Sequence, residues 1–350
     1  MSMNNVPTVS LSDLPEMLSV SATIRTPLIV WGQPGVGKSA MVKQYAKSIG
    51  AMLVDIRLSQ YESVDLRGLP DSSKCGTLTK WLMPATMPFK GNPAFPTDRP
   101  IVLFLDEIMQ ASPALQAVAF QLLHPDDRCV GEHELMDNVI VVGASNRDGD
   151  RAGVQRMLTP LANRVMHVNV ESSFDAWKGW AQQAGIDPVI IAFLSFRTEH
   201  LSQFEEALKS GAKAFPTERS WEAVSKILSV TEDPRIRSSM IAATIGTGVE
   251  AELTAFLKVQ HDVPKWSAIL ADPEQCPIPD YSRRDVLWSV VSMIFKRVDV
   301  STIDKVLPYV KRLPVEYQTV LVVDISRNKT KLLVQSQELA SLQTKLGQGV

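Results

Sequence analysis

Apolar and polar positions follow different rhythms in the two halves of this chain. The first half alternates short apolar runs, each typical of a buried strand, with stretches in which apolar residues recur every three or four positions. We expect strands at 28–31, 52–58, 101–105, 139–144 and 165–170, and helices at 11–20, 38–49, 112–123 and 158–165. Alternating strands and helices indicate an α/β fold with a parallel sheet flanked by helices and right-handed crossovers.

The second half keeps the helical rhythm throughout. We expect helices at 174–184, 187–198, 202–209, 218–230, 236–259, 283–296, 301–312, 315–327 and 332–346, with a proline-rich irregular stretch at 261–281. Gly246 and Gly248 should interrupt the helical stretch 236–259. The chain is therefore predicted to have three parts. These are an α/β core over 1–172, with an insert at 59–100 and a hairpin at 124–140, then a helical domain over 173–260 and a helical C-terminal region over 261–350.

The turn after the first predicted core strand carries the pattern G-x-x-x-x-G-K-[ST] of a P-loop. Glycine at positions 32, 35 and 37 can adopt backbone angles that other residues avoid, so that successive N–H groups can point at phosphate oxygens. Lys38 supplies a cation for the same phosphates, and the hydroxyl of Ser39 is a hard ligand suited to Mg²⁺. A plain glycine turn is the alternative, but the strand before the pattern and the helix after it favour phosphate binding.

Two carboxylates, Asp106 and Glu107, follow the apolar run Ile101–Leu105. The carboxyl end of a buried parallel strand is where α/β sheets place their ligands. Asp106 is placed to bind Mg²⁺ and Glu107 to polarise a water for attack on a γ-phosphate. An acidic pair after a strand could instead cap a helix.

Asn146 follows the apolar strand 139–144, which we expect beside the acidic strand. Its amide could orient an attacking water, although an asparagine in a turn is a common alternative. Arg164 stands before the strand 165–170 and has no obvious local partner.

Composition narrows the possible partners and compartment. The 350 residues are 45% hydrophobic and 21% charged, and the net charge of −2 gives no bulk attraction to nucleic acid or anionic membranes. No apolar run approaches the roughly 20 residues that span a bilayer. Three widely spaced cysteines and a polar N-terminus without a signal core indicate a cytoplasmic protein.

The order of these motifs resembles an AAA+ ATPase, and more narrowly the MoxR-like group. The similarity covers roughly residues 25–260 and adds two segments to the motifs above. Residues 64–68, Val-Asp-Leu-Arg-Gly, resemble a stretch that precedes the acidic strand, and Leu161–Arg164 resembles the arginine-finger motif. The family often has asparagine where this chain has Met109, which leaves the polar link from Glu107 to the pore side undefined.

The resemblance implies a P-loop AAA+ core followed by a helical lid over 173–260. Asn146 would be sensor 1, Arg219 in the segment Pro216–Trp221 would be sensor 2, and Arg164 would be the finger for the neighbouring subunit, with Arg156 as the second candidate. Glu107 would be the catalytic base, and Ser39 and Asp106 would hold Mg²⁺. The ATP-binding residues would be Gly32, Gln33, Pro34, Gly35, Val36, Gly37, Lys38, Ser39, Ala40 and Asp106.

The function implied is ATP hydrolysis by a homo-oligomeric ring, usually a hexamer, that remodels or activates a protein partner in the manner of a chaperone. Family members often work beside a protein with a von Willebrand factor A domain. A nucleic-acid motor or loader and a nucleotide-gated scaffold with little turnover are the alternatives. Nucleic acid is not expected, because the net charge is near neutral and the insert is proline-rich.

Overall fold

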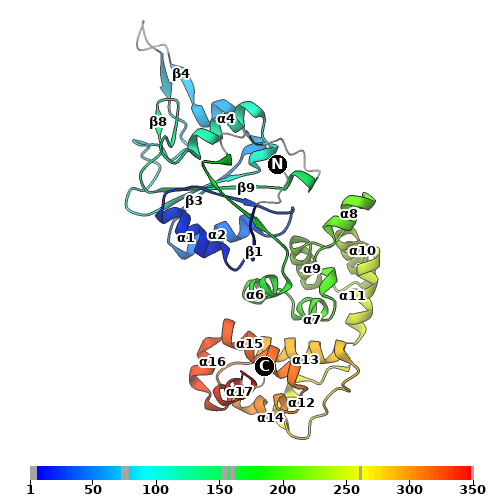
Figure 1. Ribbon diagram of the computed structural model, residues 1–350. Coiled ribbons are helices and arrows are strands. Elements are labelled where there is room, and N and C mark those ends of the chain that lie inside the picture. Colours follow the sequence, from blue (N-terminus) through cyan, green and yellow to red (C-terminus); the bar gives the residue numbers. More distant parts are fainter. Residues whose placement is uncertain (1–5, 72–78, 151–156, 158–161, 260–261, 348–350) are drawn as a thin grey trace. The chain divides into compact units, whose positions relative to one another are not determined.

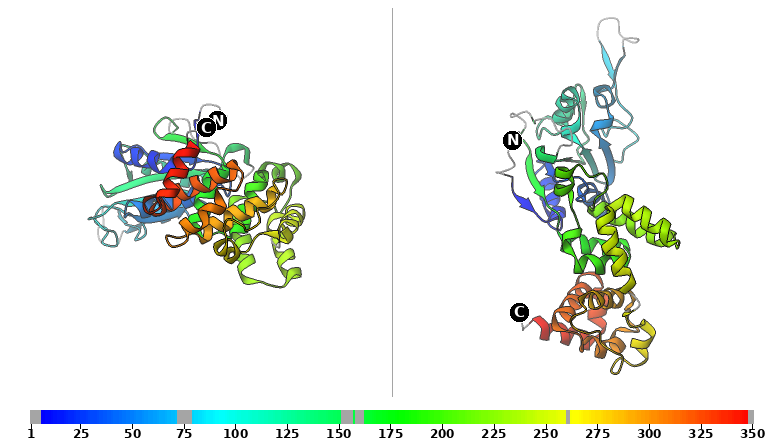
Figure 2. Two further views of the ribbon diagram at one scale, coloured as in Figure 1. Left: turned by 90° about the horizontal axis from the view of Figure 1, so that it is seen from below. Right: turned by 90° about the vertical axis from the view of Figure 1, so that its right-hand side faces the viewer.

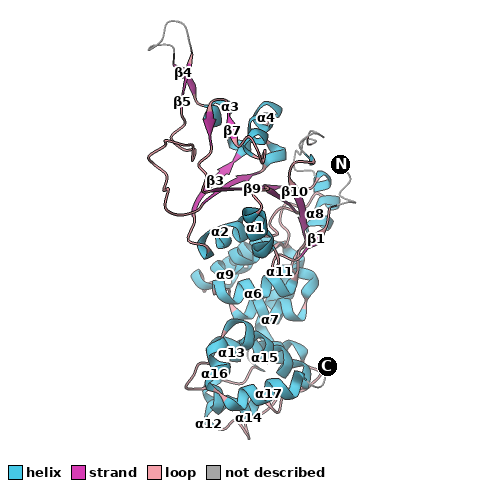
Figure 3. Ribbon diagram, turned by 60° about the vertical axis from the view of Figure 1, so that its left-hand side comes forward, coloured by secondary structure: helices cyan, strands magenta, loops and turns pink. Residues whose placement is uncertain are grey.

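The computed structural model describes residues 6–71, 79–150, 157, 162–259 and 262–347. The chain divides into two compact units, Met1–Ser172 and Ser173–Val350. Figure 1 shows the chain coloured along its sequence, and Figure 3 shows that the strands of the described residues all belong to the first unit. No helix of the described residues is both long and apolar enough to cross a membrane.

The first unit is built on a six-stranded parallel sheet with the order β1-β10-β2-β9-β6-β3. The strands are β1 (Thr8–Val9), β2 (Leu28–Trp31), β3 (Met52–Arg57), β6 (Ile101–Asp106), β9 (Val139–Ser145) and β10 (Met166–Val170). The predicted α/β fold with a parallel sheet is confirmed. β2 and β6 are buried along their whole length, as expected of parallel strands covered on both faces.

Helices cover both faces of this sheet. α1 (Leu14–Thr23) and α2 (Lys38–Ser48) lie on one face, and α4 (Pro113–Leu122) lies on the other, near the short α3 (Ser63–Arg67) (Figure 1). α4 begins where the sequence predicts, because the Ser112 hydroxyl accepts the N–H of Leu115 and Pro113 occupies the first turn. α1 begins three residues later than predicted.

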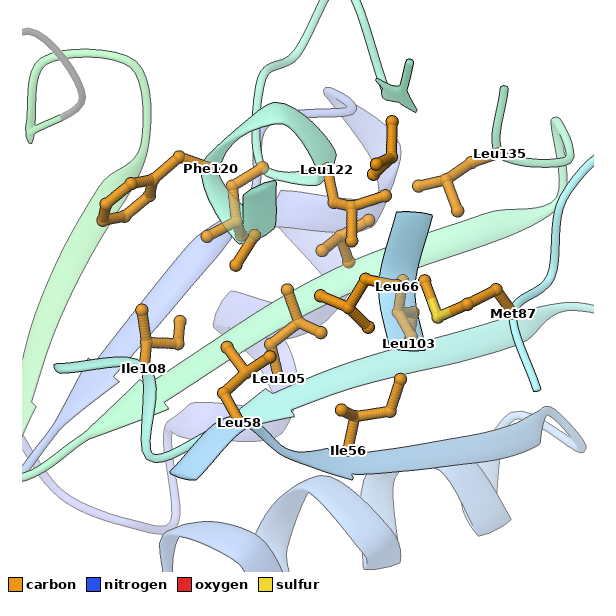
Figure 4. Close-up of a cluster of buried hydrophobic side chains, with 14 of the residues drawn as sticks. Ile56, Leu58, Leu66, Met87, Leu103, Leu105, Ile108, Phe120, Leu122 and Leu135 are labelled. Atoms are coloured by element: carbon orange, nitrogen blue, oxygen red, sulfur yellow. The ribbon is translucent and has the colours of Figure 1, made fainter. Parts of the chain in front are cut away.

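The largest apolar cluster lies between the sheet and α4. Figure 4 shows Ile56 of β3 and Leu103 and Leu105 of β6 on the same side of the sheet as Phe120 and Leu122 of α4. All five side chains are at most 3% exposed. Because this face of the sheet is sealed by apolar packing, the strands are held rigidly up to their carboxyl ends.

The predicted insert contains a 3₁₀ turn at Leu58–Gln60, α3, and a hairpin of β4 (Leu69–Asp71) and β5 (Lys80–Leu82). The hairpin projects from the first unit (Figure 2). A second hairpin pairs β7 (Cys129–Val130) with β8 (His133–Glu134). The two strands reverse direction at Gly131, which has φ of 59°.

The second unit begins with a helical bundle. Its helices are α6 (Phe174–Ala184), α7 (Pro188–Phe196), α8 (Phe204–Ser210), α9 (Glu218–Val230), α10 (Pro234–Ile245) and α11 (Thr247–Val259). The helical stretch predicted over 236–259 is two helices, and the break falls at Gly246, one of the two glycines expected to interrupt it. Gly246 separates them with φ of 86°, and a side chain there would lie 3.1 Å from the carbonyl oxygen of Ala214.

The C-terminal helices pack on this bundle within the second unit. They are α12 (Trp266–Ala271), α13 (Arg284–Arg297), α14 (Ile303–Val310), α15 (Val315–Asn328), α16 (Thr330–Gln335) and α17 (Gln337–Gly347). α13 packs against α7 and α15 against α6. The helix predicted over 332–346 is two helices, which separate at Ser336, where the hydroxyl donates to the carboxylate of Asp304. α12 lies within the stretch predicted to be irregular.

Candidate nucleotide site

The P-loop connects the buried strand β2 to α2 through two left-handed glycines. Gly35 has φ of 87°, and Gly37, the N-cap of α2, has φ of 105°. Gly32 is required for a different reason, since a Cβ atom there would lie 2.8 Å from the backbone oxygen of Val170. Only glycine fits all three positions without strain or displacement, so the loop backbone is free to face an anion at the positive end of α2.

Lys38 is buried with its ammonium group inside this loop, with 7% of the residue exposed. Nζ donates to the carbonyl oxygens of Gly32 at 2.6 Å and Gln33 at 3.1 Å, and to Oδ1 of Asn146 at 3.0 Å. Oxygen acceptors surround the cation at short range, which is the environment that phosphate oxygens could also provide. The contact also joins the P-loop to the end of β9, so two predicted site residues meet.

Ser39 and Asp106 form the second contact across the site. The Ser39 hydroxyl donates to Oδ2 of Asp106 at 2.7 Å, and Oδ1 accepts the backbone N–H of Glu107 at 2.9 Å. A hydroxyl and a carboxylate at this separation are a pair of hard oxygen donors, which fit the preferences of Mg²⁺. Asp106 is fixed as the last residue of β6, and the backbone N–H of Glu107 holds its carboxylate.

Glu107 adopts a conformation that side chains seldom adopt. Its φ of 59° and ψ of 36° lie in the left-handed region, directly after β6. The hydroxyl of Ser59 donates to Oε2 of Glu107. Strained backbone concentrates at functional sites, where the surrounding structure maintains it.

Ser59 was missed at the level of sequence. It lies in the 3₁₀ turn after β3, and β3 pairs with β6 so that Arg57 lies opposite Asp106. The only sequence signal for Ser59 is its position just after β3. The sequence around Ser59 does not show that β3 pairs with β6, the strand that carries Asp106. The described site therefore contains Lys38, Ser39, Ser59, Asp106, Glu107 and Asn146.

The predicted arginines in the described residues take no part in these contacts. Arg164 is exposed in the turn before β10, and among the described residues its guanidinium has no hydrogen-bond or ion-pair partner. Arg156 falls outside the described residues. Arg219 is exposed in the first turn of α9, which belongs to the second unit, and Thr217 caps that helix by accepting the N–H of Ser220 at 3.2 Å.

Residues 28–170 match the family described as "ATPase family associated with various cellular activities (AAA)". A comparison with curated proteins found no match. Among solved structures, an ATPase candidate from Cytophaga hutchinsonii is 13% identical, with a TM-score of 0.37, and the similarity covers 50% of each chain. This chain thus spans about half the length of that protein.

Two further solved structures are similar over more of the chain. The RuvB Holliday junction branch migration motor of Thermotoga maritima is 14% identical over 86% of each chain, with a TM-score of 0.36. NtrX of Brucella abortus in complex with ADP is 13% identical over 97% of this chain and 68% of its own, with a TM-score of 0.39. These values are too low to assign a function.

The family match, the parallel sheet and the P-loop contacts all fall on the same stretch of chain. The strand order places β2, β9 and β6 side by side, so the P-loop, Asn146 and the acidic pair converge at one edge of the sheet. The stretch that matches the AAA family of ATPases, residues 28–170, is therefore the same stretch that carries these contacts.

Proposed function

We propose that the chain is a ring-forming ATPase of MoxR type that hydrolyses ATP to remodel or activate a protein partner in the cytoplasm. The observation that carries this proposal is the pair of contacts Lys38–Asn146 and Ser39–Asp106, with Glu107 beside them. Phosphate-binding, metal-binding and base functions thus lie at one edge of the sheet, as phosphoryl transfer to water requires.

Each residue has a role that follows from its chemistry. Lys38 and the loop backbone, with Gln33, Pro34, Val36 and Ala40 along it, would hold the phosphates. Ser39 and Asp106 would hold Mg²⁺, which neutralises charge on the β- and γ-phosphate oxygens when it is bound. Glu107 is the group that accepts a proton from the attacking water, and Asn146 would help to orient that water.

The exposed arginines support a shared site. Arg164 projects from the first unit without a partner among the described residues, so its charge is available to another chain. A guanidinium supplied by a neighbour stabilises a γ-phosphoryl transition state, and closed rings are the assembly in which every site receives one. We propose a hexamer, with Arg219 reaching the nucleotide of its own subunit.

A protein client fits the surface of the insert better than nucleic acid does. Val64, Leu69 and Leu82 are 47%, 58% and 55% exposed and line an open groove of about 550 Å³. Exposed apolar surface of this kind is typical of protein interaction sites, whereas nucleic acid is held by basic groups. A partner with a von Willebrand factor A domain is part of the same proposal.

The chemistry is tested with Glu107→Gln and Lys38→Ala in a steady-state ATPase assay. Glu107→Gln should bind ATP with near-normal affinity and lose turnover, because the base is gone while the phosphate contacts remain. Lys38→Ala should lose binding. Turnover of the unaltered chain no faster than that of Glu107→Gln would instead support the nucleotide-gated scaffold.

The client and the assembly need separate measurements. The Glu107→Gln protein held in ATP should retain a protein client in a pull-down and appear as rings by electron microscopy. Addition of DNA or RNA at physiological salt should leave the ATPase rate unchanged, and strong stimulation would favour the motor or loader. A single chain that hydrolyses ATP at the full rate would refute the shared site.

A further inference from the structure

A chain of hydrogen bonds joins the P-loop strand to the turn that carries Arg164. Nε1 of Trp31 lies 3.0 Å from Nδ1 of His167, and Nε2 of His167 lies 2.8 Å from the carbonyl oxygen of Ala162. Trp31 is the last residue of β2, immediately before Gly32. Ala162 is two residues before Arg164. The imidazole thus bridges the start of the P-loop and the base of the arginine turn.

The direction of each bond follows from the donors available. An indole N–H can only donate, so Nδ1 of His167 must accept from Trp31. Nε2 then carries the proton of the neutral ring and donates it to Ala162. Both ring nitrogens are engaged, and a flipped ring would lose both bonds, so the orientation of His167 is well defined.

The turn has few other anchors in the described part of the chain. Ladder hydrogen bonds hold β10 from Met166 onward, where the N–H of Met166 bonds to the oxygen of Pro27 at 2.9 Å. Val165 packs into the core and is 8% exposed. Neither contact fixes the carbonyl of Ala162, which His167 holds directly. Misplacement of a catalytic group by 1 Å can cost about 100-fold in rate.

Resting on the proposed role of Arg164, we infer that His167 is a positioning residue that holds the turn at 162–165 and aims Arg164 at the site of the neighbouring subunit. Through Trp31, the same bonds connect this turn to Gly32, whose carbonyl oxygen accepts from Lys38 at 2.6 Å. The arginine offered to one site is thereby anchored to the P-loop of another.

The test compares His167→Phe with His167→Gln. Phenylalanine keeps a ring and removes both hydrogen bonds, whereas the glutamine amide can accept from Trp31 and donate to Ala162. His167→Phe should lower kcat by about 10- to 100-fold. The KM for ATP should stay within about twofold, because the variant keeps the P-loop residues proposed to bind the phosphates. His167→Gln should retain turnover within a few-fold. Full turnover of His167→Phe would overturn the inference.

A double-mutant cycle separates positioning from a general loss of packing. If His167 acts through Arg164, the double variant His167→Phe/Arg164→Ala should be no slower than Arg164→Ala alone. Multiplication of the two separate losses would show that His167 acts elsewhere and would overturn the inference. Circular dichroism and ring assembly of each variant, compared with the unaltered chain, reveal variants that fail to fold.

Mixing experiments test the proposed function independently of the cycle. His167→Phe and Arg164→Ala proteins should each regain turnover when mixed with Glu107→Gln, which lacks the base but offers an intact arginine. A non-additive cycle without regained activity would retain the positioning role and refute the shared site. Regained activity for Arg164→Ala but not for His167→Phe would refute only the positioning role. Full turnover of Arg164→Ala would refute both.

Discussion

At the scale of single residues, the nucleotide site maintains Glu107 in a left-handed backbone conformation that costs energy. Two contacts compensate for this cost: the N–H of Glu107 donates to Asp106, and its carboxylate accepts from Ser59. The proposed role of Glu107 is that of a base acting on one water molecule, and such a base must be oriented before the substrate arrives, so we propose that both contacts serve catalysis.

Replacement of Ser59 should therefore slow hydrolysis. Ser59→Ala removes the hydrogen bond that orients Glu107, and we expect kcat to fall by about 10-fold, which is part of the 10²- to 10⁴-fold contributed by a general base. The KM for ATP should remain within about twofold in the same assay. Ser59→Thr keeps a hydroxyl and is the matched control. Equal turnover by Ser59→Ala and the unaltered chain would show that the hydroxyl is dispensable.

The buried side chain of Tyr309 should make the stability of the fold depend on pH. Burial in α14 raises its pKa above the ordinary value of 10.0, and its hydroxyl lies 3.2 Å from the oxygen of Pro277. The folded chain then keeps this proton at pH values where the unfolded chain has lost it. Its contribution is fully present below pH 10 and is lost as the pH rises further.

Denaturant titrations at pH 8 and pH 11 measure this effect. The free energy of unfolding should be lower at pH 11 than at pH 8. The decrease should be smaller for Tyr309→Phe, because this variant has no phenol to ionise at position 309. Tyr281→Phe is the matched control, since its side chain is 64% exposed. The same loss of stability in Tyr309→Phe as in the unaltered chain would contradict the assignment.

At the scale of elements, the segments that could be predicted are those whose signals are local. The P-loop, β6 and α4 each have their strand pattern, glycines or cap within a few residues. β1 was missed because a strand of two residues is too short to show an alternating pattern. It is held by a residue far away in the sequence, Asn169, whose Nδ2 donates to Oγ1 of Thr8 at 3.0 Å.

Other boundaries depend on contacts that the sequence does not display. Gly246 and Gly248 predicted the break between α10 and α11, but the close approach of Gly246 to Ala214, more than thirty positions away along the chain, was not predicted. The contact of Ser59 with Glu107 requires the pairing of β3 with β6. In the site, residues within recognised motifs were predictable, whereas a hydroxyl on a neighbouring strand was not. The chemical roles of all the site residues, Arg164 and Arg219 included, remain predictions.

The close approach of β2 and β10 should make Gly32→Ala costly. The added methyl group would lie 2.8 Å from the backbone oxygen of Val170, and we expect a loss of about 1–3 kcal/mol in the free energy of unfolding. Gly179→Ala in α6 is the control, because nothing lies within 4 Å of its added Cβ. It should stabilise the helix by up to about 1 kcal/mol. Chemical denaturation of both variants checks the opposite signs, and a neutral Gly32→Ala would contradict the close approach.

At the scale of the whole molecule, the second unit joins its two groups of helices through polar as well as apolar contacts. Nζ of Lys178 in α6 lies 2.8 Å from Oδ2 of Asp324 in α15, and the two side chains are 9% and 11% exposed. Gln182 donates to the same oxygen at 3.0 Å. We therefore expect the C-terminal helices to move together with helices α6–α11 as one body.

Removal of one partner should be more harmful than removal of both. Lys178→Met leaves a buried carboxylate without its cation, and we expect a loss of about 3–5 kcal/mol in denaturation experiments on the second unit. The double variant Lys178→Met/Asp324→Leu should lose less than either single variant. Lys226→Met breaks an exposed pair with Glu222 and should change stability by at most about 1 kcal/mol. Additive losses in the double variant would argue against a buried pair.

The hydrogen bond between Trp31 and His167 should also make the fluorescence of Trp31 a probe of the neighbouring P-loop. Trp31 is 6% exposed and immediately precedes Gly32, the first residue of the P-loop pattern. Indole fluorescence responds to hydrogen bonding and local polarity, so the emission of Trp31 should report rearrangement of that loop in real time. Trp31→Phe identifies its share among the seven tryptophans. Stopped-flow mixing could then follow nucleotide arrival and departure without a dye.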